Sequence, residues 1–206
     1  MKKIPIGKHH HFDRIQYDPN QLFLIYYDHD QHTIFCKSST TFQNLILLRN
    51  ITVRAFAYNA NERTLFVIES QSKTLRMYMP ITCEIKHDIK MHSWNLNKNL
   101  NEIQSMEIDI DNRQFIFATQ YDFLISNLSE PNSTKIVYST DRKINKFVYD
   151  PAFKRIFWTT MNKTHENLFF VHTCDSEFRS CLDTSVILPI SWPFAFFNVS
   201  NHRLIE

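Results

Sequence analysis

Apolar and polar residues alternate along short segments of this chain, and one longer pattern recurs. The segments FDRIQYDPNQLFLIYYD (12–28) and INKFVYDPAFKRIFWTT (144–160) align without gaps. Each begins with alternating apolar residues, passes through Tyr-Asp-Pro and then reaches a second apolar run. Alternation with a period of two is typical of a β-strand with one packed face, so the pattern predicts a hairpin. Three further segments keep the same frame: 53–69, 103–119 and 192–206.

An Asp or Asn ends the first predicted strand of every repeat. Such a side chain can hydrogen-bond the backbone that follows it, which favours a turn at that point. The turn residues are Asp18, Asn59, Asp109, Asp150 and Asn198. The residues before them are Tyr17, Tyr58, Ile108, Tyr149 and Phe197.

Two more apolar stretches follow in most repeats, such as TIFCKSS and NLILLR in the first, so each repeat predicts about four strands. A four-stranded unit that recurs about every 40 to 50 residues is typical of a β-propeller blade. We therefore predict an all-β fold, a partial β-propeller of four-stranded blades. The alternative is a β-sandwich with coincidental spacing, which would not require the same turn residue in every repeat.

The repeat frame also divides the chain. It predicts an N-terminal tail over 1–11 and a propeller over 12–206, with the blades given by these approximate ranges: 12–52, 53–102, 103–143, 144–191 and a truncated 192–206. About four and a third blades cannot close a six-bladed ring, so we expect a piece of a longer chain with exposed strand edges. Met1–Gly7 has no apolar stretch of the length found in signal peptides.

Composition excludes several classes of function. The single glycine is Gly7, so the Gly-rich phosphate-binding loops of Rossmann and P-loop proteins are absent. The net charge of +2 is too small to indicate a nucleic-acid-binding surface. No apolar run in this segment is long enough to span a membrane. Aromatic residues make up 14% of the chain, which suits packed sheets.

The repeat resembles the YWTD-type (class B) repeats of the low-density lipoprotein receptor family. The fourth unit carries the resemblance best, in FVYDP and in IFWTT with Trp158 at the motif; the first unit offers IQYDP and LIYYD. No copy holds the full tetrapeptide, and the family's later glycine is missing. The resemblance covers 12–206 and implies a six-bladed extracellular propeller that binds protein ligands, in a parent chain that could be a single-pass receptor.

Four cysteines bear on the compartment. Cys174 and Cys181 flank a short loop between predicted strands, where a disulfide can form; the alternative is two buried thiols in a reducing cell. Cys36 and Cys83 lie in adjacent units and could pair with each other or with sequence outside this segment. No C-x-x-C occurs, so a zinc ribbon or a thioredoxin-type site is not expected.

Asn-x-Ser/Thr sequons in surface loops of a secreted protein accept glycans. By that criterion we expect glycosylation at Asn50, Asn132 and Asn162. Asn198 is interpreted first as a turn residue, and the sequence does not decide whether Asn127 is glycosylated. If the blade strands run up and down, the connectors between blades share one face with the turns between second and third strands. Trp94, in the long predicted connector 86–102, is then the best aromatic ligand contact, unless it packs on its own blade.

These observations favour a non-catalytic, extracellular protein-binding propeller that needs no cofactor and no metal. One alternative is a propeller hydrolase of the lactonase type, whose site would need acidic or amide side chains around a central metal. Another is a degenerate, non-functional fragment. Neither G-x-S-x-G nor H-E-x-x-H occurs in the sequence.

Overall fold

The structure is a computed structural model that describes residues 12–71, 73–83, 89–96, 102–161, 168–189, 196–198 and 203–205. The chain divides into two compact units, residues 1–101 and 102–206. Among the described residues, strands and tight turns make up almost the whole structure, and no helix has the length and apolar character needed to cross a membrane.

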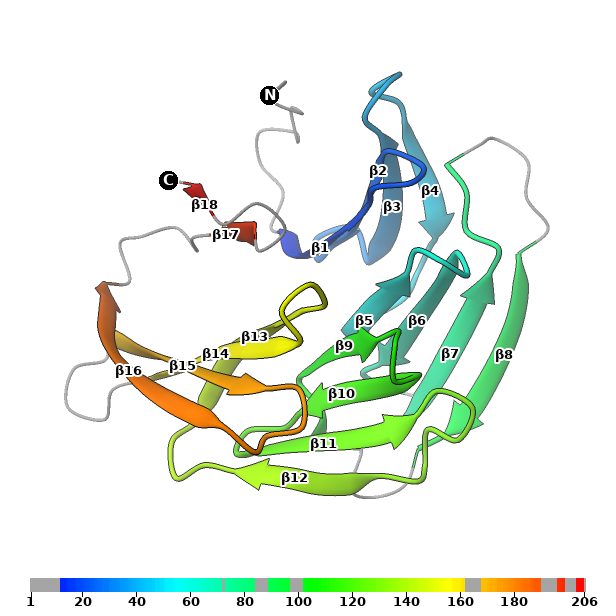
Figure 1. Cartoon of the computed structure of the whole chain (residues 1–206). Helices are drawn as coiled ribbons and strands as arrows, with labels where there is room; N and C mark the ends of the chain where they lie inside the picture. The colour runs from blue at the N-terminus through cyan, green and yellow to red at the C-terminus, as the bar shows by residue number, and fades with distance from the viewer. Residues whose placement is uncertain are drawn as a thin grey trace. The chain divides into compact units, whose positions relative to one another are not determined.

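The first unit contains two antiparallel sheets, each with its four strands in chain order (Figure 1). The first sheet consists of β1 (Phe12–Asp18), β2 (Phe23–Asp28), β3 (Thr33–Ser38) and β4 (Asn44–Leu48). The second sheet consists of β5 (Val53–Asn59), β6 (Thr64–Glu69), β7 (Thr74–Met79) and β8 (Lys90–Asn95).

The second unit repeats this arrangement. One sheet consists of β9 (Ser105–Asp109), β10 (Gln114–Ala118), β11 (Asp122–Asn127) and β12 (Lys135–Ser139). The next consists of β13 (Ile144–Asp150), β14 (Arg155–Met161), β15 (Leu168–Asp175) and β16 (Cys181–Pro189), and a two-stranded sheet follows with β17 (Phe196–Asn198) and β18 (Arg203–Ile205). Four-stranded antiparallel meanders of this kind are β-propeller blades, so the predicted all-β propeller class is confirmed.

The repeat frame is visible in the strands themselves. Each predicted turn residue in the four complete repeats is the last residue of the first strand of its sheet. Tyr17, Tyr58, Ile108 and Tyr149 therefore occupy equivalent positions in β1, β5, β9 and β13. This equivalence is what a repeated blade requires.

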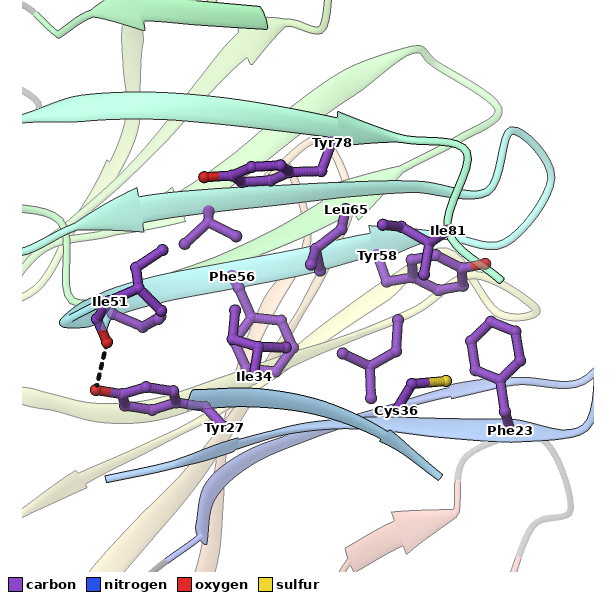
Figure 2. Close-up of a cluster of buried hydrophobic side chains, with 13 residues drawn as sticks. Phe23, Tyr27, Ile34, Cys36, Ile51, Phe56, Tyr58, Leu65, Tyr78 and Ile81 are labelled. Atoms are coloured by element: carbon purple, nitrogen blue, oxygen red, sulfur yellow. Dashed lines mark hydrogen bonds between the residues drawn. The ribbon is translucent and has the colours of Figure 1, made fainter. Parts of the chain in front are cut away.

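Two sheets pack face to face in the first unit (Figure 2). The first sheet contributes Ile25 and Tyr27, and the second contributes Phe56 and Leu65, all of them buried. Residues two apart on one strand point to the same face, which is why alternate positions enter this cluster. Each such side chain stabilises the fold by about 1.5–3 kcal/mol when it leaves water.

The second unit has a more aromatic core. Phe123, which is fully buried, lies in ring contact with Tyr138, Phe147, Trp158 and Phe178 at centroid distances of 5.1–6.4 Å. All four pairs are tilted or edge-on, the arrangements that aromatic quadrupoles prefer. The Trp158 of the repeat motif is thus a core residue that packs one blade against the next within this unit.

Candidate interaction surface

The predicted turn residues form the turns that close the first hairpin of each sheet. Asp18 Oδ1 accepts hydrogen bonds from the backbone N–H groups of Asn20 and Gln21, at 2.8 and 2.9 Å. The equivalent side chains of Asn59, Asp109 and Asp150 accept backbone N–H groups in the same way. All four side chains are buried, so they are structural residues at what we call the hairpin end of each sheet.

The last residue of each of these turns has a left-handed backbone, a conformation that favours glycine. Leu22, Arg63, Arg113 and Lys154 hold this position, with φ between 51° and 54°. Their carbonyl oxygens accept, in the same order, the N–H groups of Ser39, Ile81, Leu128 and Ser176, at 2.8–2.9 Å. Each first hairpin is thereby joined to the chain that leaves the third strand of its sheet.

A tyrosine connects adjacent blades at the hairpin end. The Tyr58 hydroxyl donates to Asp18 Oδ2 at 2.7 Å, and both side chains are buried. Tyr149 and Asp109 hold the equivalent positions in the second unit, where burial and the Asp109 carboxylate raise the pKa of Tyr149, although its hydroxyl makes no hydrogen bond of good geometry. Tyr17, the equivalent residue of the first blade, is 48% exposed.

This contact predicts the effect of Tyr58→Phe. We expect the free energy of unfolding to fall by about 2 kcal/mol, because the variant leaves the buried Asp18 carboxylate without one of its donors. Tyr17→Phe is the matched control at the equivalent, exposed position and should change stability by less than about 0.5 kcal/mol. Urea unfolding followed by tryptophan fluorescence measures both; equal effects would contradict the assigned role of the Tyr58 hydroxyl.

The same tyrosine predicts a loss of stability in alkali. Burial, together with the hydrogen bond and charge of Asp18, raises the pKa of Tyr58 above its ordinary value of 10.0. The unfolded chain therefore ionises first, so the contribution of Tyr58 to the free energy of unfolding should be fully present below about pH 10 and should fall above it. Urea titrations from about pH 8 to pH 11 measure this slope, and the Tyr58→Phe/Tyr149→Phe double variant should show a shallower one. An unchanged slope in the double variant would count against the prediction.

The opposite end of each sheet, which we call the connector end, holds the turn between the second and third strands and the connector that leaves the fourth. In the first sheet, Asp28 accepts two backbone N–H groups of the turn that follows it. The carbonyl of His32 in this turn accepts the N–H of Ile51, and the Tyr27 hydroxyl donates to the Ile51 carbonyl at 3.1 Å (Figure 2). Turn and connector are therefore held as one piece.

The connector end of the second sheet is hydrogen-bonded to the connector that leaves the first sheet. The Thr52 carbonyl accepts the N–H of Ser70 at 2.8 Å, and the Arg54 guanidinium donates to the Ser70 carbonyl at 3.1 Å. Glu69, the last residue of β6, forms a 2.6 Å ion pair with Arg76. The loops at this end are thus fixed relative to one another, as a surface that recognises a rigid partner needs.

The third sheet repeats the arrangement in the second unit. Thr119, which replaces the acidic residue of the motif, accepts the N–H groups of Tyr121 and Asp122 through Oγ1. The Tyr121 carbonyl accepts the N–H of Thr140, and the Gln120 carbonyl accepts the N–H of Ile144. The turn is again hydrogen-bonded to the connector that follows its sheet.

This connector end presents residue types that dominate protein interfaces. Tyr121 is 44% exposed, and the Arg142 guanidinium lies 4.5 Å from the centroid of the Phe170 ring. Arg142 is half-buried, and Tyr and Arg side chains are among the most frequent energetic anchors of protein–protein contacts. Our reading of the sequence did not single out Tyr121, although an aromatic residue within the polar turn TQYD was a usable signal.

The predicted long connector over 86–102 is wrong in part, because Lys90–Asn95 forms the outermost strand of the second sheet. Its exposed polar side chains suit an edge strand but hide the strand signal in the sequence. Trp94 is half-buried on this strand, opposite Leu75 and in edge-on contact with His92 at 4.4 Å. It lies near the connector end, and its role as a ligand contact stays a prediction.

Both possible disulfides are formed. The predicted bond between Cys174 and Cys181 joins β15 and β16 at directly paired positions, with a Cα–Cα distance of 4.1 Å. Cys36 and Cys83, whose pairing the sequence left open, are bonded at a Cα–Cα distance of 5.7 Å and connect the first sheet to the chain that follows β7. Each bond lies within one compact unit.

The predicted glycan acceptors differ in their surroundings. Asn50 is exposed in the connector after β4 and has a left-handed backbone, with φ 55°. Asn132 is half-buried in the turn before β12. Asn162 lies outside the described residues. Glycosylation at these three positions stays a prediction.

Comparison with known proteins shows the fold. No protein-family model matches the sequence, and no curated protein matches it either. A chain of the nidogen/laminin complex superposes with a TM-score of 0.62 at 10% identity, over 78% of this chain and 60% of that one. A protein of unknown function from Bacteroides thetaiotaomicron gives 0.63 at 11% identity, over 86% and 44%.

The tricorn protease also superposes, with a TM-score of 0.56 at 14% identity, over 85% of this chain and 17% of that one. This chain therefore spans less than two thirds of each of these structures. Likeness at such low identity reports architecture and not chemistry. Together with the four-stranded meanders, it shows a β-propeller fold.

Proposed function

We propose that this chain is a non-catalytic, protein-binding propeller on the outside of the cell, of the low-density lipoprotein receptor class B type. The observation that carries the proposal is the pair of disulfides, one between adjacent blades and one within a blade, because such bonds persist in oxidising compartments. The repeated Tyr-Asp-Pro hairpins and the motif around Trp158 support the family, and the likeness to a chain of the nidogen/laminin complex supports a protein ligand.

The connector ends supply the binding surface in this proposal. Within each unit, taken by itself, the loops at this end are hydrogen-bonded to the neighbouring connector, so little ordering is needed when a partner binds. Tyr121 and Arg142 offer an exposed aromatic and a cation on the second unit, and Trp94 offers a half-buried aromatic on the first. Binding through loops that a rigid scaffold positions is the usual way in which propellers acquire specificity.

The state of the acidic side chains supports binding over catalysis. Asp18, Asp109 and Asp150 are buried and accept backbone N–H groups of their own turns. At the connector ends, Asp28 does the same, and Asp122 accepts the Ser139 hydroxyl at 2.6 Å. These carboxylates perform structural work, which leaves them poorly placed for general acid–base chemistry.

Binding of immobilised extracellular proteins tests the proposal, with laminin as the first probe and purified receptor ectodomains next. The oxidised chain should bind at least one of them, and Tyr121→Ala should weaken binding by about 10-fold or more. Phe153→Ala is the matched control, because this aromatic is 49% exposed at the hairpin end; it should change binding by less than about 2-fold.

Two outcomes would contradict parts of the proposal. Equal losses for Tyr121→Ala and Phe153→Ala would move the binding surface away from the connector end. Absence of binding across the whole set at about 10 µM, with both disulfides confirmed by mass spectrometry, would overturn the protein-binding function itself.

A further inference from the structure

The sequon Asn127-Leu128-Ser129 lies where β11 ends, at the hairpin end of the third sheet. Leu128 is buried and its N–H donates to the Arg113 carbonyl at 2.9 Å, which fixes the middle of the sequon. The two outer residues, Asn127 and Ser129, are both exposed. The acceptor and the hydroxyl residue are therefore displayed together on a backbone that is held in place.

The two side chains are also arranged relative to each other. Asn127 Oδ1 accepts the Ser129 N–H at 2.9 Å and the Ser129 hydroxyl at 2.8 Å. Both bonds use the carboxamide oxygen, and neither uses Nδ2, the atom to which a sugar is joined. A glycan on Nδ2 keeps Oδ1, so the modified residue retains both hydrogen bonds of this turn.

A shallow polar pocket adjoins the acceptor. Asn127 lines it together with Asn112, Arg113, Gln114 and Lys135. These side chains carry amide, guanidinium and ammonium donors, which suit the hydroxyl and acetamido oxygens of a first N-acetylhexosamine. The pocket thus offers room and hydrogen-bond partners for the sugar next to the protein.

The neighbouring sequon is less well prepared. Asn132 and Thr134, the acceptor and the hydroxyl residue of that sequon, are both half-buried, whereas Asn127 and Ser129 are exposed. Asn127 also lies at the opposite end of β11 from Asp122 and the Tyr121 turn, so a glycan there leaves the proposed binding surface of this sheet uncovered.

From these contacts we infer that Asn127 is an N-glycosylation acceptor, occupied in preference to Asn132. The inference rests on the extracellular location in the proposed function. The donor is a lipid-linked oligosaccharide diphosphate: Asn127 Nδ2 forms a bond to the anomeric carbon of the first sugar and loses one proton, while the bond from that carbon to the diphosphate oxygen breaks and the lipid diphosphate leaves.

Secretion of the whole chain behind a heterologous leader, from a cell that performs N-glycosylation, tests the inference. Enzymatic deglycosylation in heavy-oxygen water followed by peptide mass spectrometry gives the occupancy of each sequon. We expect most molecules to carry a glycan at Asn127 and at least 3-fold fewer at Asn132. Ser129→Ala should abolish the Asn127 glycan and Ser129→Thr should preserve it.

Asn127→Asp is the second variant. It removes the amide nitrogen that carries the glycan and keeps an oxygen that can accept the two hydrogen bonds from Ser129. It should be secreted with one glycan fewer and should bind the probe of the proposed function as the unmodified sequence does. An unoccupied Asn127 in secreted chain that is glycosylated at Asn50 would overturn the inference and leave the proposed function standing. A chain that is glycosylated at Asn127 but binds none of the probes would overturn the proposed function and leave the inference standing.

Discussion

Replacing both Cys36 and Cys83 by alanine is expected to lower the free energy of unfolding of the first unit by about 4 kcal/mol. The bond closes a loop with a sequence separation of 47, and constraining a loop of that length removes much of the entropy of the unfolded chain. Cys36 is fully buried, so the variant also loses sulfur contacts between the two sheets. Guanidinium unfolding of the oxidised proteins measures the difference.

The second disulfide provides the comparison. Cys174→Ala/Cys181→Ala opens a loop with a separation of only 7, which predicts a loss of about 2 kcal/mol in the second unit. Reduction of the unchanged sequence should reproduce both losses together. Identical unfolding midpoints for oxidised protein and the Cys36/Cys83 variant would show that this bond contributes nothing to the fold.

Phe123→Ala is expected to cost about 3–5 kcal/mol of stability in the second unit. The Phe123 ring is fully buried and contacts four other aromatic rings, so its removal leaves a cavity that rigid neighbours cannot fill by small movements. Thermal and urea unfolding, followed by near-ultraviolet circular dichroism of the aromatic cluster, measure the loss.

Ile136→Ala is the matched control, because this apolar side chain belongs to the same sheet and is 56% exposed. It should cost less than about 1 kcal/mol. A comparable loss for both variants would mean that the aromatic cluster is not the core that holds these two blades together.

The sequence predicts the blade well because its signals are local. Alternating apolar residues and a turn-forming Asp or Asn lie within one hairpin, so Asp18 and its equivalents could be placed before any tertiary contact was known. Cys174 and Cys181 are similarly close in sequence, and their bond forms as expected.

The features that escaped prediction depend on contacts between distant segments. The bond between Tyr58 and Asp18 requires two blades to be packed together, and the pairing of Cys36 with Cys83 requires the same packing. The strand around Trp94 has a weak apolar pattern because it lies at the edge of its sheet, where pairing with β7 decides its conformation. The sequence marks Tyr121 as an aromatic residue in a polar turn, but only the structure shows that this turn is hydrogen-bonded to the connector after its sheet.

The left-handed turn residues have a consequence for how the chain acquires its structure. Among the described residues, eight positions with this backbone hold neither glycine nor asparagine: Leu22, His32, Phe42, Arg63, Lys73, Arg113, Lys154 and Phe178. Each disfavours its own turn by about 1–2 kcal/mol, so a hairpin cut out as a peptide should remain unstructured. We therefore expect these turns to form only when whole blades collapse, and we do not expect an isolated hairpin to nucleate folding.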